Sequence, residues 1–162
     1  MIAQTERLIL RAFSADDAQS IIDLLNDPAF LEFIGDRGVR NLEDAHAYMK
    51  RVPLKAVQLK DGPFIGICGL IKRDWLEDHD IGFAYLPAFR TQGYAGEAAQ
   101  ATIDLARKEG MRRLGAIVDP RNERSEKLLA RLGFQFERMV QSDKQEELKL
   151  WMLELNATNQ LD

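Results

Sequence analysis

The sequence predicts a single α/β domain, residues 1–162, in which a mixed sheet carries helices on both faces. With 162 residues, 46% of them hydrophobic, the chain is long enough for one domain with a full core and too short for two of usual size. Strand-like alternation and helical spacing follow one another along the chain. Residues 79–118 have the pattern strand, helix, strand, which predicts a parallel β-α-β unit whose helix crosses one face of the sheet.

The first third of the chain predicts one strand and two helices. Residues 7–13 alternate in polarity, as a strand with one buried face does. Ser14 and Asp17 have the positions of a capping box ahead of a helix that we expect to end at 26–28, before an irregular segment through Phe30, Phe33 and Gly35. Asn41 is expected to cap the second helix, 42–51.

The remainder predicts a hairpin, the β-α-β unit, another helix and two last strands, which makes about seven strands and four helices in all. We expect Asn156 and the residues after it to fray. The expected ranges are strands 54–59 and 64–71 around a turn at Asp61 and Gly62, a polar loop 72–78, strand 79–86, a helix whose spacing runs from Ala95 to Glu109, strand 114–118, helix 125–132, and strands beginning near 134 and 148.

The segment 86–97, LPAFRTQGYAGE, joins a strand to a helix through glycines. A helix N-terminus leaves about four N–H groups free and carries roughly half a positive charge, so it holds an anion without a lysine. Gly93 and Gly96 lack a Cβ, which lets the backbone approach a bulky oxyanion closely. We therefore interpret the segment as a pyrophosphate site. The alternative is a helix start that needs glycine for packing.

Composition excludes several classes of protein. The formal net charge is −4, so the chain lacks the basic surface typical of nucleic-acid binding. Cys68 is the single cysteine and cannot form an internal disulfide. Arg7 and Arg11 interrupt the apolar N-terminal run, unlike a signal peptide, and no apolar run approaches the roughly 20 residues that span a bilayer. We expect a soluble, cytoplasmic protein that binds neither nucleic acid nor membrane.

Three motifs resemble the GNAT N-acetyltransferases, with the closest likeness to the ribosomal-protein N-terminal acetyltransferase branch. Arg90-Thr91-Gln92-Gly93-Tyr94-Ala95 matches the family's Arg/Gln-x-x-Gly-x-Gly/Ala signature at the strand-to-helix junction. The segment 122–134, N-x-x-S-x-x-L-L-x-x-L-G-F, resembles the second cofactor segment, and 5–11, TERLILR, resembles the opening of that branch. The resemblance implies a mostly antiparallel sheet of six or seven strands with a central, splayed parallel pair.

The resemblance also implies an enzyme that transfers acetyl from acetyl-CoA to an amine, a protein N-terminus or a small molecule, in a ternary complex without a metal ion. The pyrophosphate would lie on the N–H groups of 92–96 and the pantetheine between strands 79–86 and 114–118. An N–H group near 83–86 would polarise the thioester carbonyl. The cofactor-binding residues expected are Phe83, Ala84, Tyr85, Leu86, Arg90, Thr91, Gln92, Gly93, Tyr94, Ala95, Gly96, Asn122 and Ser125.

Leu129 departs from the family pattern, because many members carry there a tyrosine thought to protonate the leaving thiolate. A thiol of pKa near 8.5 leaves as thiolate at neutral pH for about 2 kcal/mol, so activity does not require that phenol. Ser125 could supply a hydrogen bond instead. The candidates for accepting the amine proton are His79 and Asp80, directly or through water. The competing hypothesis is a catalytically weak or inactive acyl-CoA sensor.

Several residues keep a structural alternative beside the functional one. Asn122 suits a helix cap as well as a cofactor contact. Glu77, Asp78 and Asp80 could attract a cationic amine or form a solvated loop. The sequence leaves the acceptor, and the choice between monomer and homodimer, open. Residues that could line the acceptor site or belong to ordinary packing are Phe33, Tyr48, Met49 and Trp75, whereas Cys68 is expected to be a small buried hydrophobe.

Overall fold

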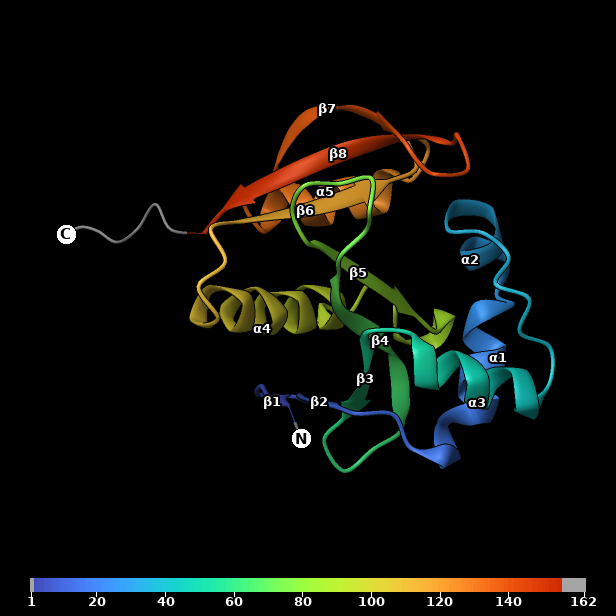
Figure 1. Cartoon of the computed structure of the whole chain (residues 1–162). Coiled ribbons are helices and arrows are strands. Elements are labelled where there is room, and N and C mark those ends of the chain that lie inside the picture. The colour runs from blue at the N-terminus through green and yellow to red at the C-terminus, as the bar shows by residue number, and fades with distance from the viewer. Residues whose placement is uncertain (1, 156–162) are drawn as a thin grey trace. The chain divides into compact units, whose positions relative to one another are not determined.

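The computed structural model describes residues 2–155, so the tail from Asn156, which we expected to fray, lies outside the described residues. Strands and helices alternate largely as predicted (Figure 1). The strands are β1 (Ala3–Gln4), β2 (Leu8–Arg11), β3 (Leu54–Leu59), β4 (Phe64–Ile71), β5 (Asp80–Tyr85), β6 (Arg113–Val118), β7 (Gln135–Gln141) and β8 (Glu147–Glu154). The helices are α1 (Ala18–Leu25), α2 (Pro28–Phe33), α3 (Leu42–Arg51), α4 (Tyr94–Lys108) and α5 (Glu123–Arg131), with short 3₁₀ turns η1 (Ala15–Asp17) and η2 (Pro87–Phe89).

The strands form one eight-stranded sheet in the order β1-β2-β3-β4-β5-β6-β8-β7. The pairs β1–β2, β2–β3, β3–β4, β6–β8 and β7–β8 are antiparallel. The pair β5–β6 is parallel, with Asp80 in register with Gly115. The mixed sheet with one parallel pair is thereby confirmed. The eighth strand is β1, a two-residue pairing with β2 that the sequence analysis did not anticipate.

The described chain divides into two compact units. The first runs to Gly69 and includes Phe83–Ala101, and the second comprises Leu70–Gly82 and the chain from Thr102 on. The division passes through β4, β5 and α4, so each of these elements contributes residues to both units. The prediction of a single domain stays a prediction.

The first unit contains the sheet from β1 to β4 and the helices α1 to α3, where α1 packs on α3 (Figure 1). Leu8 and Leu10 of β2 are fully buried while Ile9 and Arg11 are half-buried, which confirms the predicted alternation. The capping box of Ser14 and Asp17 is present. Other large side chains that are fully buried in this unit are Ile21, Leu24, Leu25, Val39, Val57 and Ile65.

One prediction about the first unit is wrong. We expected an irregular chain after Pro28, but 28–33 form helix α2. The Asp27 carboxylate accepts hydrogen bonds from the N–H groups of Ala29 (3.1 Å) and Phe30 (3.4 Å), and Pro28 occupies the first helical position. Proline is favoured there because the N–H that it lacks would have no intrahelical partner. The Asp-Pro pair therefore starts a second helix where we expected the chain to become irregular.

The second unit contains β6, β8 and β7 in antiparallel order, helix α5 and the beginning of β5. Helix α5 begins at Glu123, two residues before the predicted start, because Asn122 acts as its cap. Gly133 follows the helix with a φ of +99°, as predicted for a C-terminal glycine. Buried side chains include Ile103, Leu114, Leu128, Leu129, Phe134, Leu150 and Leu155.

Candidate functional site

The turn that leads into α4 has the backbone form predicted for an anion site. Thr91 and Gly93 have φ values of 64° and 86°, and the helix begins at Tyr94. The left-handed conformation at Gly93 favours glycine. A Cβ there would also lie 3.1 Å from the guanidinium of Arg7, so an alanine would displace the end of that side chain slightly.

The N–H groups at this helix start are free. Glu97 is the first residue of α4 whose N–H bonds within the helix, to the carbonyl of Gly93 at 3.1 Å. Within the described chain, no hydrogen bond is formed by the N–H groups of 92–96. Residues 91–93 are exposed and 94–96 are half-buried. These donors, with the positive end of the helix dipole, form a site suited to an anion of pyrophosphate size.

The side chain of Arg90 binds protein groups. Its Nε donates to the carbonyl of Tyr85 (2.9 Å), and its Nη2 donates to the Asp27 carboxylate (2.7 Å). Asp27 is the residue that caps α2, so Arg90 ties the end of β5 to the start of that helix. The predicted role of Arg90 in cofactor binding is untested, and its guanidinium is in any case engaged by Asp27.

The end of β5 lies tightly against β4. An ideal Cβ on Gly66 would overlap the carbonyl oxygen of Ala84 and lie 3.0 Å from the Cα of Tyr85. The N–H of Leu86 donates to the carbonyl of Ile65 at 2.9 Å. Among the expected oxyanion donors of 83–86, Leu86 therefore has its N–H occupied, and the roles of Phe83, Ala84 and Tyr85 stay predictions.

Tyr85 itself is a buried phenol. Burial raises its pKa well above the usual value, and the neighbouring Cys68 adds to this effect. Apart from the neighbouring Cys68, its hydroxyl has no polar partner among residues 2–155. Cys68 is fully buried, which confirms it as a small buried hydrophobe.

In the second unit, Asn122 and Ser125 lie at the start of α5. The Asn122 Oδ1 accepts a hydrogen bond from the N–H of Ser125 at 3.3 Å, which confirms the capping interpretation. The amide nitrogen of Asn122 and the hydroxyl of Ser125 are left for other partners, and both residues are half-buried. Leu129 is 1% exposed, so its side chain belongs to the core of this unit.

Asp80 and His79 have very different surroundings. Asp80 is 1% exposed and accepts from Arg73 Nε at 2.9 Å and from Arg73 Nη2 at 3.4 Å. Burial raises the pKa of Asp80, and the nearby positive charge of Arg73 offsets this only in part. The alternative of a solvated Asp80 is therefore wrong. His79 is half-buried, and its backbone carbonyl accepts from the N–H of Gly115 at 2.8 Å.

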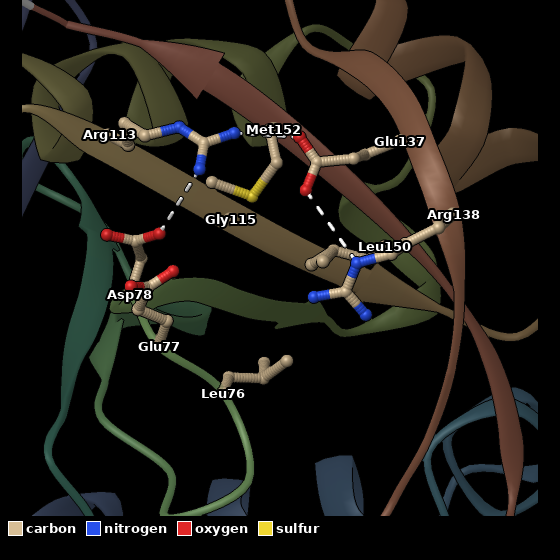
Figure 2. A pocket seen from close by; sticks show the side chains of 9 residues that line it. All are labelled: Leu76, Glu77, Asp78, Arg113, Gly115, Glu137, Arg138, Leu150 and Met152. Atoms are coloured by element: carbon tan, nitrogen blue, oxygen red, sulfur yellow. Dashed lines mark hydrogen bonds and ion pairs between the residues drawn. The ribbon is translucent and has the colours of Figure 1, made fainter.

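Two carboxylates of the acidic cluster that we considered as an amine attractant, Asp78 and Asp80, pair with arginines. Figure 2 shows Asp78 pointing toward Arg113 across a shallow pocket of about 290 Å³, part of it open solvent; their charged atoms lie 3.7 Å apart. Arg113 also pairs with Glu137 at 2.7 Å. The pocket contains none of the residues predicted to bind the cofactor or to act in catalysis. It is lined by Leu76, Glu77, Asp78, Arg113, Gly115, Glu137, Arg138, Leu150 and Met152.

The residues considered for the acceptor site mostly have packing roles. Trp75 packs against Leu76, Leu150 and Met152, and the guanidinium of Arg73 lies 5.6 Å from the centre of one of its rings. Tyr48 is buried in α3. Within 2–155 no three His, Cys, Asp or Glu side chains are grouped to hold a metal ion, and no helix there has the length and apolarity to span a bilayer.

The sequence analysis did not predict the side chains that contact the turn before α4. Thr5 and Arg7 hydrogen-bond to Glu97 in the first turn of α4, and Arg7 also bonds to the carbonyl of Gln92. The motif containing Thr5 and Arg7 was singled out by resemblance, but no periodicity connects it to a helix about 90 residues later. Asp27, the partner of Arg90, was missed for the same reason.

Comparisons with known proteins identify the family of this chain. A family model described as an acetyltransferase (GNAT) domain matches residues 7–135. An uncharacterized N-acetyltransferase, YnaD of Bacillus subtilis (strain 168), is 29% identical over 140 residues, which cover 82% of each chain.

Two solved structures share the fold over nearly the whole chain. Spermidine N-acetyltransferase from Vibrio cholerae, solved in complex with CoA and spermine, has a TM-score of 0.77 at 16% identity and covers 94% of this chain and 98% of that one. Ribosomal-protein-S5-alanine acetyltransferase from Vibrio fischeri has a TM-score of 0.73 at 20% identity and covers 98% of both chains.

Proposed function

The chain belongs to the GNAT family of acetyltransferases, and from this premise we propose that it transfers an acetyl group from acetyl-CoA to a primary amine. The observation that carries the proposal is the set of free N–H groups of 92–96 at the start of α4. Such groups recognise the pyrophosphate of a nucleotide cofactor through the backbone alone. The solved relative with bound CoA supports the same cofactor class.

The thioester would be activated by the strand that precedes the turn. An N–H group among Phe83, Ala84 and Tyr85 donates to the carbonyl oxygen as it gains negative charge. A neutral amine attacks the carbonyl carbon, the tetrahedral intermediate collapses, and the carbon–sulfur bond breaks to release the CoA thiolate. No acid is needed to expel a thiolate of pKa near 8.5, so the buried Leu129 is compatible with turnover.

In the proposed reaction, three side chains assist the acetyl transfer. The Ser125 hydroxyl donates a hydrogen bond to the departing sulfur, since its backbone N–H alone serves the cap. His79 accepts the proton that the amine loses, directly or through water. Asp80 assists as a buried counter-charge next to His79 and Arg73, because a carboxylate that is 1% exposed cannot touch an incoming amine.

The acceptor is proposed as a primary amine of a polyamine or of a protein N-terminus. The solved relatives include one enzyme of each kind, a spermidine acetyltransferase and a ribosomal-protein acetyltransferase. An N-terminal α-amine has a pKa near 8 and is partly neutral at physiological pH, whereas an alkyl amine near 10 needs more help from a base. The pH dependence of turnover therefore distinguishes the two acceptor classes.

The test measures binding and chemistry separately. Calorimetry with acetyl-CoA gives the affinity, and thiol release is followed with spermidine, spermine and peptides that begin with alanine or serine. Gly93→Ala is the binding-site variant, and Gly110→Ala is its matched control. Both glycines have positive φ, 86° and 85°, and both substitutions incur similar backbone strain, but Gly110 lies at the far end of α4 with nothing within 4 Å.

We expect the wild type and Gly110→Ala to bind acetyl-CoA and Gly93→Ala to lose about tenfold or more in affinity, the loss of roughly one charge-assisted hydrogen bond. Absence of binding by the wild type contradicts the proposal. Tight binding without thiol release from any acceptor would instead support the acyl-CoA sensor that Leu129 first suggested.

A further inference from the structure

The segment from Thr5 to Leu8 forms hydrogen bonds with the turn before α4 and with the first turn of that helix. The Thr5 hydroxyl donates to Glu97 Oε2 at 2.5 Å, and the N–H of Arg7 donates to the same oxygen at 2.9 Å. The Thr5 hydroxyl in turn accepts the N–H of Leu8 at 3.0 Å. One carboxylate of α4 is thus held by both the side chain and the backbone of the N-terminal segment.

The guanidinium of Arg7 makes three further contacts, each with a different residue of the turn and helix. Nε donates to Glu97 Oε1 at 2.7 Å, Nη1 donates to the carbonyl of Gln92 at 3.1 Å, and the guanidinium carbon lies 4.4 Å from the centre of the Tyr94 ring. Arg7 nevertheless remains 42% exposed at its side chain, so it lies at the rim of the site rather than in the core.

The hydrogen bond from Arg7 to the Gln92 carbonyl fixes the direction of the next N–H group, that of Gly93. In a trans peptide the C=O and the following N–H point in opposite directions, and no peptide bond of the described chain is cis. Because the Gln92 carbonyl points toward Arg7, the N–H of Gly93 points away from it. The Gly93 carbonyl is held likewise by the N–H of Glu97, which orients the N–H of Tyr94.

The bond to Glu97 has an electrostatic consequence. A carboxylate in the first turn of a helix stabilises the helix, but it repels any other anion that binds at the same N-terminus. Partial burial acts to raise the pKa of Glu97, yet the hydrogen bonds from Thr5 and Arg7 outweigh it and the pKa is lowered. Glu97 is therefore ionised at neutral pH, and the positive charge of Arg7 offsets it.

From these contacts we propose that Arg7 is a positioning residue for the CoA pyrophosphate: it orients the N–H of Gly93 and neutralises Glu97 so that an anion can bind the start of α4. The inference rests on the proposed function, because it assigns a role to Arg7 within the same cofactor site. It differs from a purely structural attachment of the N-terminal strand, which would need both members of the ion pair equally.

The test compares CoA affinities by calorimetry for Arg7→Ala, Glu97→Gln and the double variant. Arg7→Ala leaves the Glu97 charge unpaired beside the anion and frees the Gln92 carbonyl, so we expect affinity to fall about tenfold. Glu97→Gln removes the repulsive charge and keeps one amide oxygen, which can accept from either the guanidinium or the backbone N–H of Arg7, so affinity should stay equal or rise. The double variant should bind CoA more tightly than Arg7→Ala alone.

Arg11→Ala is the matched control, because Arg11 also leaves β2 to pair with one carboxylate, Asp17, at 2.8 and 2.9 Å. It has no contact with the turn, so we expect a loss of stability without a change in CoA affinity beyond about twofold. Circular dichroism confirms folding at the temperature of each titration. Should Arg7→Ala not fold, Arg7→Lys, which keeps the charge but not the three-way contact, is measured in its place, and an affinity below that of the wild type is expected; an unchanged affinity contradicts the positioning role.

The outcomes are distinguishable. A wild type that binds no CoA refutes the proposed function, and with it this inference. A wild type that binds CoA while Arg7→Ala binds equally well refutes the positioning role alone. A Glu97→Gln variant that loses as much affinity as Arg7→Ala, with no recovery in the double variant, shows a structural attachment and also refutes it.

Discussion

Two buried aspartates, Asp17 and Asp80, each pair with an arginine but differ in the direction of their pKa. Burial acts to raise the pKa of Asp17, but the bidentate bonds of Arg11 and the N–H of Ser14 outweigh it, and the pKa is lowered. For Asp80, burial is the largest effect and Arg73 offsets only part of it, so the pKa is raised. The difference follows from how many donors reach each carboxylate.

We predict opposite pH dependences of stability for Asp17→Asn and Asp80→Asn. A lowered pKa means that Asp17 contributes stability above about pH 3.8, its ordinary pKa, and loses it as pH falls through the folded pKa. Asp17→Asn should therefore cost about 1–3 kcal/mol at pH 7, and progressively less as pH falls below about 3.8 towards the lowered pKa of Asp17. Urea unfolding at several pH values measures this.

For Asp80 the sign is reversed. The folded state holds this proton more tightly than the unfolded state, so stability falls as pH rises from about 3.8 through the raised pKa. Asp80→Asn does not ionise, so its stability should improve relative to that of the wild type as pH rises from about 3.8 through the raised pKa of Asp80. If the stability of Asp80→Asn relative to that of the wild type fell with rising pH, the raised pKa of Asp80 would be contradicted.

The comparison of Asp17 with Asp80 also indicates which side-chain contacts can be predicted from a sequence. The contact of Asp17 with Ser14 is local, three residues apart, and its capping pattern was predicted correctly. The burial of Asp80 depends on how the loop around Trp75 folds back to bring Arg73 over β5. No periodicity in the sequence describes such a loop, so neither the burial of Asp80 nor its pairing with Arg73 could be predicted.

At the scale of elements, helix α5 tests whether Asn122 has one role or two. Its Oδ1 caps the helix through the N–H of Ser125. We predict that Asn122→Ala lowers the free energy of unfolding by about 1 kcal/mol, the usual cost of losing an N-cap. Asn122→Asp should restore the stability, because aspartate caps equally well.

The same pair of variants reports on the cofactor. Aspartate has the capping oxygen but lacks the amide N–H donors of asparagine. If Asn122 also donates to CoA, as the proposed function implies, Asn122→Asp should be as stable as the wild type and yet have a raised KM for acetyl-CoA. An unchanged KM would leave Asn122 as a cap alone.

Elements with local signals were the most predictable, and proline was the exception. The caps at Ser14 and Asn41 and the closing Gly133 all occur where predicted. Pro28 was interpreted as a helix end, yet it begins α2, because proline is compatible with the first turn of a helix and incompatible only with its interior. The choice depends on whether the following residues find packing partners, and Phe30 is buried.

At the scale of the molecule, β5 and α4 each supply residues to both compact units. Neither unit can unfold without breaking a strand or a helix that the other one uses. We therefore predict a single cooperative thermal transition, with the calorimetric enthalpy equal to the van't Hoff enthalpy. Two separate transitions, or a stable proteolytic fragment corresponding to one unit, would contradict the prediction of a single domain.

The sequence by itself determined the order of strands and helices, the parallel unit at 79–118, the helix caps and the glycine turn before α4. The resemblance of the motifs at 90–95 and 122–134 to GNAT signatures also indicated the family. These features depend on neighbours within about four residues, where backbone geometry and side-chain spacing leave few alternatives.

Only the tertiary structure decided which side chains meet across the chain. No periodicity in the sequence relates Arg7 to Glu97 or Arg90 to Asp27, yet each pair forms an ion pair in the structure. The hydrogen bond of the Leu86 N–H and the burial of Asp80 likewise depend on residues distant in sequence. A charged side chain pairs with whatever packing brings within about 4 Å, and many sequences of the same pattern would pack differently. The position of the anion site follows from the sequence, and the residues that brace it follow from the fold.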